Sequence, residues 1–195
     1  MEAASVGTRV GVVGAGVAGI TTATALRKRG FNGSITLFEA EAMTYDRPRL
    51  SKDFLSGSAS RADIEQFGTS WFEEHGIDFR VGQTVTSLDR DRLGVVCSDN
   101  SRVDADVIVL ATGGRPLMPA WALANSERVH ALRTLHDADQ LRPHLVSGAR
   151  IGVVGTGLLG AEVAISAQSM GAVVTTIDPV AYPMAEILGE KLAGW

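Results

Sequence analysis

The chain has 195 residues, of which 45% are hydrophobic and 21% charged, and its formal net charge is −4. These values are typical of a globular protein of one or two domains. The acidic balance and the scattered Lys and Arg side chains argue against a phosphate-binding stripe, so we expect no nucleic-acid partner. No apolar run reaches the roughly 20 residues of a membrane span, and we expect a cytoplasmic protein without membrane contact.

Cysteine and histidine usage excludes several kinds of site. A single cysteine, Cys97, rules out an internal disulfide, a redox-active cysteine pair and a cysteine-based metal cluster. We expect Cys97 to be an inert thiol on a strand, because no basic residue flanks it. The four histidines show no metal-ligand spacing with Cys97 or with one another, so no metal site is predicted.

The N-terminal part of the chain predicts a strand, a helix and a second strand. The expected elements are Arg9–Val13, Val17–Arg29 with Gly30 as its C-cap, and Ser34–Phe38. The turn between the first strand and the helix lies in the stretch GVVGAGVAG, which has the G-x-G-x-x-G spacing of a dinucleotide-binding loop.

Each glycine of this loop has a physical role. Gly14 would make the tight turn, Gly16 would admit a pyrophosphate against the backbone, and Gly19 would let helix and strand pack closely. The helix N-terminus would offer N–H groups and a partial positive charge to the phosphates. Glu39 stands where a ribose-binding carboxylate is expected. A glycine-rich turn without a ligand is the alternative, but strand, helix and Glu39 together favour dinucleotide binding.

From Asp78 to Thr112 the pattern changes to short strands with turn signals between them. The segments are DFRVG, QTVTSLDRD, RLGVVCSDNS and RVDADVIVLATG, and the Asp-Arg-Asp and Asp-Asn-Ser clusters predict hairpin turns. A βαβ sheet that is interrupted by a small antiparallel meander and rejoined by an apolar strand favours a flavin-binding domain over a plain NAD-binding domain. We assign Trp71, Phe72 and Ile77 to the core.

After a connection, the opening pattern repeats. Prolines 116, 119 and 143 and a helix expected over Leu135–Leu145 indicate a segment between domains. The second copy comprises the strand Arg150–Val154, the stretch GVVGTGLLG, a helix through Met170 and the strand Val173–Ile177. A last helix is expected over Ala185–Ala193. The second loop offers a second set of candidate dinucleotide-binding residues: Gly155, Gly157, Leu158, Leu159 and Gly160.

Asp178 stands in the second copy where Glu39 stands in the first. A carboxylate at this strand end accepts hydrogen bonds from a ribose 2′-hydroxyl and repels a 2′-phosphate, so Asp178 favours NAD over NADP. The alternative is that Asp178 only caps the following segment beside Pro179.

These elements predict an α/β fold with tandem Rossmann-like βαβ domains, parallel sheets and a small antiparallel meander. We expect an FAD-binding domain over residues 1–113, a connecting segment over 114–148 and an NAD-binding domain over 149–195. A parallel sheet needs further crossover strands and covered edges, so we expect both domains to be incomplete and the chain to be a truncated form.

Several stretches resemble one family closely. The sequence YDRPRLSK from Tyr45 to Lys52, together with ATGGRP, LRTL, GTGLLGAEVA and the glycine loops, is similar to the FAD-dependent, NADH-oxidising ferredoxin reductases. These are the reductase components of dioxygenase and P450 systems, a class of pyridine nucleotide-disulfide oxidoreductases without redox cysteines. The resemblance covers essentially the whole chain. Family members have Pro where this chain has Arg49, a departure that adds a cation near the expected flavin site.

The resemblance implies an FAD site at the first loop and an NADH site at the second. Ala15 and Glu39 would hold the adenosine end of FAD. The remaining FAD contacts would come from Arg47, Lys52, Val85, Thr112, Gly113 and Arg133. Lys52 would lie beside the flavin and pair with Glu162, and these two are the candidate catalytic residues.

The implied activity is hydride transfer from NADH to FAD, followed by single-electron transfer to a ferredoxin-type iron–sulfur protein. Cations at Arg27, Lys28, Arg29 and Arg61 are candidate contacts for an acidic ferredoxin. Two alternatives remain: a catalytically silent FAD- and NAD-binding fragment, and a piece that binds neither. The sequence predicts no oligomeric state.

Overall fold

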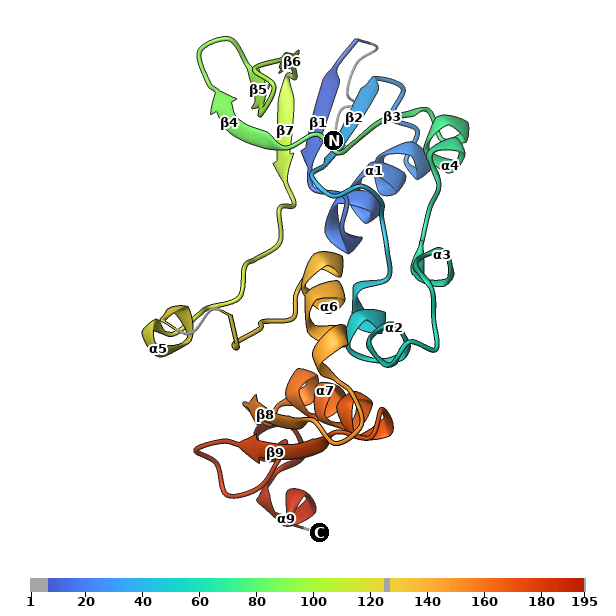
Figure 1. Ribbon diagram of the computed structural model, residues 1–195. Helices are drawn as coiled ribbons and strands as arrows, with labels where there is room; N and C mark the ends of the chain where they lie inside the picture. Colours follow the sequence, from blue (N-terminus) through green and yellow to red (C-terminus); the bar gives the residue numbers. More distant parts are fainter. Residues whose placement is uncertain (1–6, 125–126, 195) are drawn as a thin grey trace. The chain divides into compact units, whose positions relative to one another are not determined.

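A computed structural model gives the structure of residues 7–124 and 127–194. The chain divides into two compact units (Figure 1). One contains the residues up to Tyr45 and Glu65–Gly114, and the other contains Asp46–Ile64 and the residues from Arg115 onward. Residues 1–6 and Trp195, which belong to the predicted domain ranges, lie outside the described residues. The domain boundaries themselves stay a prediction.

The first unit holds a four-stranded parallel sheet and a three-stranded antiparallel sheet. The strand orders are β3-β2-β1-β7 and β4-β5-β6. Its elements are β1 (Arg9–Val13), α1 (Val17–Lys28), β2 (Ser34–Glu39), α4 (Thr69–Glu74), β3 (Ile77–Val81), β4 (Val85–Asp89), β5 (Gly94–Cys97), β6 (Arg102–Asp104) and β7 (Val107–Leu110). In β1, Val12 pairs with Leu37 on one side and Val109 on the other. The parallel sheet and the meander agree with the predicted fold class.

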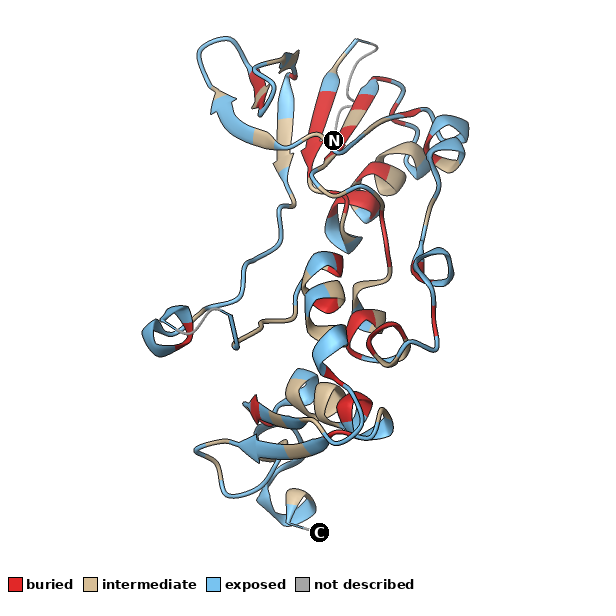
Figure 2. Ribbon diagram, viewed as in Figure 1, coloured by how far each residue is buried: buried red, intermediate tan, exposed pale blue. Residues whose placement is uncertain are grey.

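Alternation along β1 and β2 buries both faces of the parallel sheet. Val12 and Leu37 point to the face that α1 and α4 cover, where they pack with Ile20 and Phe72. On the other face, Val13 and Phe38 pack against residues of the meander, among them Val95 and Cys97. The resulting core is drawn in red in Figure 2. Cys97 lies on β5, so its expected place on a strand is confirmed, and it is 1% exposed.

Two sequence-based expectations for this unit need correction. The segment DFRVG, apart from its final Gly82, lies in β3, which pairs in parallel with β2. It therefore belongs to the same sheet as the opening βαβ unit and not to the antiparallel meander. The segment RVDADVIVLATG is two strands rather than one. β6 pairs with β5, and the chain then turns at Asp106, whose backbone N–H and carboxylate both bond to Arg9, so that β7 enters the parallel sheet beside β1.

The assignment of the aromatic segment to the core is confirmed for two of its three residues. Phe72 and Ile77 are buried. Trp71 is only partly buried, and its ring stacks on His75 with the ring centroids 4.0 Å apart.

The second unit contains the second copy of the strand–loop–helix pattern. Its elements are η1 (Arg47–Ser51), α2 (Asp53–Ser56), α3 (Arg61–Ile64), α5 (Ala120–Leu123), α6 (Leu135–Leu141), η2 (Arg142–His144), β8 (Arg150–Val154), α7 (Leu158–Ser169), β9 (Val173–Ile177), α8 (Ala185–Leu188) and α9 (Glu190–Ala193). β8 and β9 form a two-stranded parallel sheet. The core of this unit contains Leu55 from α2, Leu145, which directly follows η2, and Ala167 from α7.

Two expected helices of this unit are interrupted. The helix expected over Leu135–Leu145 is α-helical only to Leu141, and Arg142–His144 form the 3-10 helix η2. The change occurs because Pro143 lacks the N–H that an α-helix needs. The helix expected over Ala185–Ala193 breaks into α8 and α9 at Gly189, where φ is +76°.

Candidate functional site

The first glycine loop joins the ends of three neighbouring strands. Gly14, directly after β1, has φ of +103° and donates its N–H to the Phe38 carbonyl oxygen at 2.9 Å. A Cβ at Gly14 would overlap the carbonyl oxygen of Ala111 and lie 3.2 Å from the Cα of Thr112. The loop therefore needs glycine here, and it brings Thr112 and the following Gly113 to the carboxyl ends of β1 and β2.

Glu39 closes this end of the first unit. Its carboxylate accepts the N–H of Ala15 at 3.0 Å and the N–H of Glu41 at 2.9 Å. A carboxylate has about four acceptor positions, so these two bonds fix its orientation and leave capacity for ligand hydroxyls. The Gln83 N–H bonds to the Glu39 carbonyl oxygen at 2.8 Å, and Val85 follows two residues later at the start of β4. The first-unit candidate residues thus gather around one sheet edge.

The start of α1 offers room for an anion. Gly16 is the N-cap of α1, and no side chain among the described residues caps this helix start. A Cβ built on Gly16 would have nothing within 4 Å, so the space in front of the loop is open. Backbone N–H groups of a first helical turn that lack intrahelical partners are suited to phosphate oxygens.

The second loop repeats this geometry in the second unit. Gly155 has φ of +97° and donates its N–H to the Ile177 carbonyl oxygen at 2.8 Å. Gly157 is the N-cap of α7 without a capping side chain among the described residues, and a Cβ on Gly160 would overlap the Gly155 carbonyl oxygen. Leu158 and Leu159 form the first turn of α7 and are exposed.

Asp178 is held by more bonds than Glu39. It accepts the backbone N–H and the hydroxyl of Thr156, the hydroxyl at 2.9 Å, and the N–H of Val180 at 3.1 Å. These hydrogen bonds hold the pKa of Asp178 below its usual value. The backbone N–H of Thr156 is the largest cause, followed by the N–H of Val180 and the Thr156 hydroxyl. The second loop therefore ends in a fixed carboxylate anion.

Lys52 and Glu162 lie together in the second unit. The Lys52 Nζ is 3.3 Å from Oε1 of Glu162. The Ser51 hydroxyl donates to the other carboxylate oxygen, Oε2, at 2.5 Å. Lys52 follows η1, and Glu162 is on the first half of α7, so the pair joins two segments that are far apart in the sequence.

Arg47 and Arg133 are also neighbours in this unit. Arg47 donates from Nη1 to the Arg133 carbonyl oxygen at 2.6 Å. Arg133 precedes α6, and its N–H donates to Asp137 at 3.0 Å, next to the capping box that Thr134 and Asp137 form. Arg47, Lys52 and Arg133 thus belong to the second unit, and the other candidate FAD residues belong to the first.

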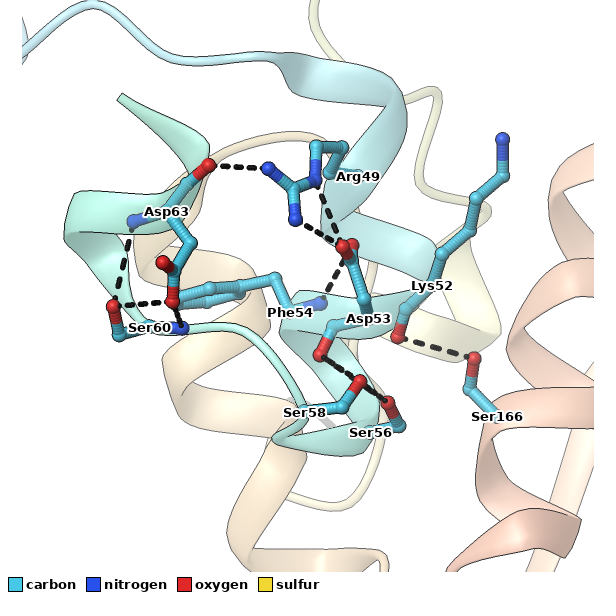
Figure 3. Close-up of polar contacts among 9 residues, drawn as sticks. All are labelled: Arg49, Lys52, Asp53, Phe54, Ser56, Ser58, Ser60, Asp63 and Ser166. Carbon is cyan, nitrogen blue, oxygen red and sulfur yellow. Dashed lines mark hydrogen bonds and ion pairs between the residues drawn. The ribbon is translucent and has the colours of Figure 1, made fainter. Parts of the chain in front are cut away.

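The extra cation at Arg49 is neutralised locally. Its Nε donates to Asp53 at 2.8 Å, its Nη2 also contacts that carboxylate, and its Nη1 donates to the Asp63 carbonyl oxygen (Figure 3). The hydrogen bond with Arg49 is the main cause of the lowered pKa of Asp53. Arg49 therefore ties η1 to α2 and α3 rather than presenting an unpaired charge.

Sequence reasoning did not identify Ser51, Thr156 and Ser166 as parts of this arrangement. Ser166, which is buried, donates to the Ser51 carbonyl oxygen at 2.6 Å. Thr156 carries a signal in the sequence, since it is a hydroxyl residue at the loop position where the first copy has Ala15. Ser51 and Ser166 carry no such signal, because their contacts depend on how distant segments dock.

Two of the candidate ferredoxin contacts are already engaged. Arg27 donates to four backbone carbonyl oxygens, those of Phe31, Gly33, His75 and Gly76. Arg61 pairs with Asp139 at 2.5 Å. Among the described residues, no three His, Cys, Asp or Glu side chains gather into a possible metal site, and no helix there is long and apolar enough to cross a bilayer.

Comparison with known proteins decides the family. Residues 8–195 match the family described as pyridine nucleotide-disulphide oxidoreductase. The chain belongs to this family. The match spans both loops, the segment that carries Lys52 and the helix that carries Glu162. Within this pyridine nucleotide-disulphide oxidoreductase family, the chain is similar to the ferredoxin–NAD(+) reductase subunit of a benzene 1,2-dioxygenase system from Pseudomonas putida, with 37% identity over 187 residues.

Solved structures of relatives have the same fold. The chain is similar to putidaredoxin reductase in its covalent complex with putidaredoxin, with a TM-score of 0.84, 32% identity, and coverage of 97% of this chain and 48% of that one. A ferredoxin reductase from Rhodopseudomonas palustris gives a TM-score of 0.86 and 27% identity, with coverage of 95% and 46%. The benzene dioxygenase relative is covered to 45% of its length and this chain to 95%. The chain thus spans less than half the length of the relatives it matches.

Proposed function

We propose that this chain binds FAD at the first glycine loop and NADH at the second, as part of a flavoprotein reductase that serves a ferredoxin-type iron–sulfur protein. The observation that carries the proposal is the repeated loop: in both copies an N–H between the first two glycines is held by the carboxylate at the end of the next strand. The relatives named as ferredoxin–NAD(+) reductase and putidaredoxin reductase support the direction of electron flow.

The residues present fit both nucleotides. Open space in front of Gly16 and Gly157 leaves the backbone accessible to a pyrophosphate, and each loop sits at the start of a helix of 12 residues. Glu39 and Asp178 keep unused acceptor positions for ribose hydroxyls. Arg47, Val85, Thr112, Gly113 and Arg133 are proposed as further FAD contacts on the basis of the resemblance.

When bound, the flavin would accept a hydride from NADH and pass two electrons on one at a time. The chain's contribution is placement and charge. Lys52 would put a cation beside the flavin. Glu162 would hold that cation in position through its ion pair with the Lys52 Nζ. No side chain is assigned as a general acid or base.

Asp178 supports NADH rather than NADPH as the donor. Three hydrogen bonds fix its carboxylate and lower its pKa, so a negative charge stands at the expected ribose end at neutral pH. A 2′-phosphate would meet this charge, whereas a 2′-hydroxyl can donate to it.

We further propose that the functional domains follow the predicted ranges: FAD-binding over residues 1–113, connecting over 114–148 and NAD-binding over 149–195. The reductase is proposed to act in the cytoplasm. Its single cysteine leaves no internal disulfide to maintain, which suits a reducing compartment.

The test begins with binding. The full chain is titrated with FAD and separately with NADH by isothermal calorimetry. Glu39→Ala should weaken FAD binding at least about tenfold with little effect on NADH, because it removes a charged hydrogen-bond acceptor from one loop only. Asp178→Ala should do the reverse. Binding of neither nucleotide by the wild-type chain would contradict the proposal.

The second step tests electron transfer. FAD-reconstituted protein receives NADH under anaerobic conditions, and loss of the oxidised flavin absorption band is expected. An unchanged flavin spectrum despite binding of both nucleotides would favour the silent binding module. Reduction followed by transfer to an added ferredoxin would support the full proposal.

A further inference from the structure

The Lys52–Glu162 ion pair has a structural weakness that its neighbours correct. The Lys52 side chain is 52% exposed and that of Glu162 20% exposed. An exposed ion pair contributes little free energy and does not by itself fix the geometry of two flexible side chains. If this pair is to hold a charge at one place, other contacts must set the direction of the carboxylate.

The Ser51 hydroxyl supplies such a contact, and the Ser166 hydroxyl in turn holds the backbone of Ser51. The Ser51 hydroxyl donates to Oε2 of Glu162 at 2.5 Å, which leaves Oε1 to face the Lys52 Nζ at 3.3 Å. Ser166 donates in turn to the Ser51 carbonyl oxygen at 2.6 Å and lies 3.4 Å from that of Lys52. Figure 3 shows the Lys52 carbonyl oxygen turned toward Ser166 while the Lys52 side chain extends away from it.

Both contacts come from one face of α7. Glu162 and Ser166 are four residues apart in a continuous helix, so their side chains project from the same side. Ser51 is therefore held at both its hydroxyl and its carbonyl. Ser51 and Ser166 are 2% and 6% exposed, which protects these bonds from competition with water.

We propose that Ser51 and Ser166 are positioning residues for the Lys52–Glu162 pair: Ser51 orients the carboxylate, and Ser166 fixes the Ser51–Lys52 backbone against α7. The importance of the pair for hydride transfer rests on the proposed function, but the contacts do not. The proposal is therefore tested on the protein without nucleotide.

The chain contains three lysines, Lys28, Lys52 and Lys191, which allows a residue-specific assay. The folded protein is treated briefly with an N-hydroxysuccinimide ester of acetate, and acetylation at each lysine is followed by mass spectrometry. The free amine attacks the ester carbonyl, forms the amide and releases N-hydroxysuccinimide. A lysine whose amine is held by a carboxylate is less free to attack and therefore reacts slowly. Lys28 and Lys191 are exposed and serve as references in every variant.

Loss of the carboxylate sets the upper limit of the effect. Glu162→Gln should raise the Lys52 acetylation rate about threefold relative to the two references, and Ser51→Ala and Ser166→Ala should each raise it about twofold. Ser166→Thr keeps the hydroxyl and should stay close to wild type. Ser58→Ala is the matched control, since Ser58 contacts Ser56 and the Asp53 carbonyl but neither member of the pair.

A stability control separates positioning from packing. Leu55 is fully buried in the core that it shares with Ala167 of α7, so Leu55→Ala should lower the thermal midpoint more than Ser51→Ala does. Its Lys52 acetylation rate should nevertheless rise less. Acetylation rates that follow the thermal midpoint across all variants, or that stay at the wild-type level in Ser51→Ala and Ser166→Ala, would overturn the proposal.

These outcomes do not depend on nucleotide binding. A chain that fails to bind FAD or NADH but shows the expected acetylation pattern would refute the proposed function alone. If Ser51→Ala does not fold, as loss of its cooperative thermal transition would report, Ser166→Ala with its Ser166→Thr counterpart carries the test.

Discussion

Thr156 donates twice to Asp178, from its backbone N–H and from its hydroxyl, whereas Ala15 at the matching position of the first loop donates only its N–H to Glu39. The two copies are otherwise closely matched. The connection from helix to second strand is residues 29–33 in the first copy and 170–172 in the second, two residues shorter. The extra hydroxyl bond makes the second carboxylate the more tightly fixed of the two.

The first prediction concerns nucleotide preference. Asp178→Asn removes the negative charge while it keeps the size of the side chain. NADH binding should weaken about tenfold, because a charged acceptor is lost. NADPH binding should stay unchanged or tighten, because the repulsion of the 2′-phosphate is removed. Calorimetric titrations of both nucleotides measure the ratio, with Glu190→Gln, an exposed carboxylate on α9, as the control. An unchanged ratio would show that Asp178 only caps its own turn.

The second prediction contrasts two glycines of one loop. Gly14→Ala places a side chain at φ of +103° and against the Ala111 carbonyl oxygen, and should cost at least about 2 kcal/mol of unfolding free energy. Gly16→Ala meets no atom within 4 Å and has φ of −76°, so it should cost no more than about 1 kcal/mol, the usual cost of Ala at an N-cap.

The ligand response should be the opposite for Gly16. Its methyl group would stand where a phosphate approaches the backbone, so FAD affinity should fall at least about tenfold while the fold persists. Urea unfolding and FAD titration on the same samples measure both effects. A Gly16→Ala protein that binds FAD as tightly as wild type would place the cofactor elsewhere.

The loops and strands could be predicted because their causes are local. Gly14, Glu39 and the β-branched runs act within one strand–helix–strand unit, and the same holds for Gly155 and Asp178. The boundary errors have local causes as well, such as Pro143 in the expected helix at Leu135–Leu145.

The environment of the Lys52–Glu162 pair was beyond local reasoning. Ser51 and Glu162 are 111 positions apart, and no spacing rule links them. The resemblance implied the partner of Lys52 but said nothing of Ser51 or Ser166, because these contacts depend on the docking of η1 against α7. The turn at Asp106, which sends β7 back to the parallel sheet, likewise depends on Arg9, 97 residues away.

The third prediction reassigns Arg27 from a binding surface to the fold. Its guanidinium joins the end of α1 to the turn before β3 through bonds to four carbonyl oxygens, including those of Gly33 and Gly76. Arg27→Met should lower the unfolding free energy by about 1–3 kcal/mol, because it leaves these acceptors without a charged donor. The neighbouring Arg29→Met, at an exposed position, should have less than about 0.5 kcal/mol of effect. Equal effects in urea unfolding would contradict this role.

The fourth prediction concerns pH and the pair His130 and His144, whose ring centroids are 4.8 Å apart. Burial, and then the charge of His144, lowers the pKa of His130 below 6.5. In the unfolded chain His130 therefore binds its proton at a higher pH than in the folded protein. The unfolding free energy should accordingly fall as the pH drops below about 6.5, and the loss should end once the pH is below the folded-state pKa.

His130→Gln should flatten this dependence between about pH 7 and 5, while His136→Gln, an exposed histidine of the same unit, should leave it unchanged. Urea unfolding across the pH series measures the slope, and the same slope in all three proteins would mean that other groups cause the acid sensitivity.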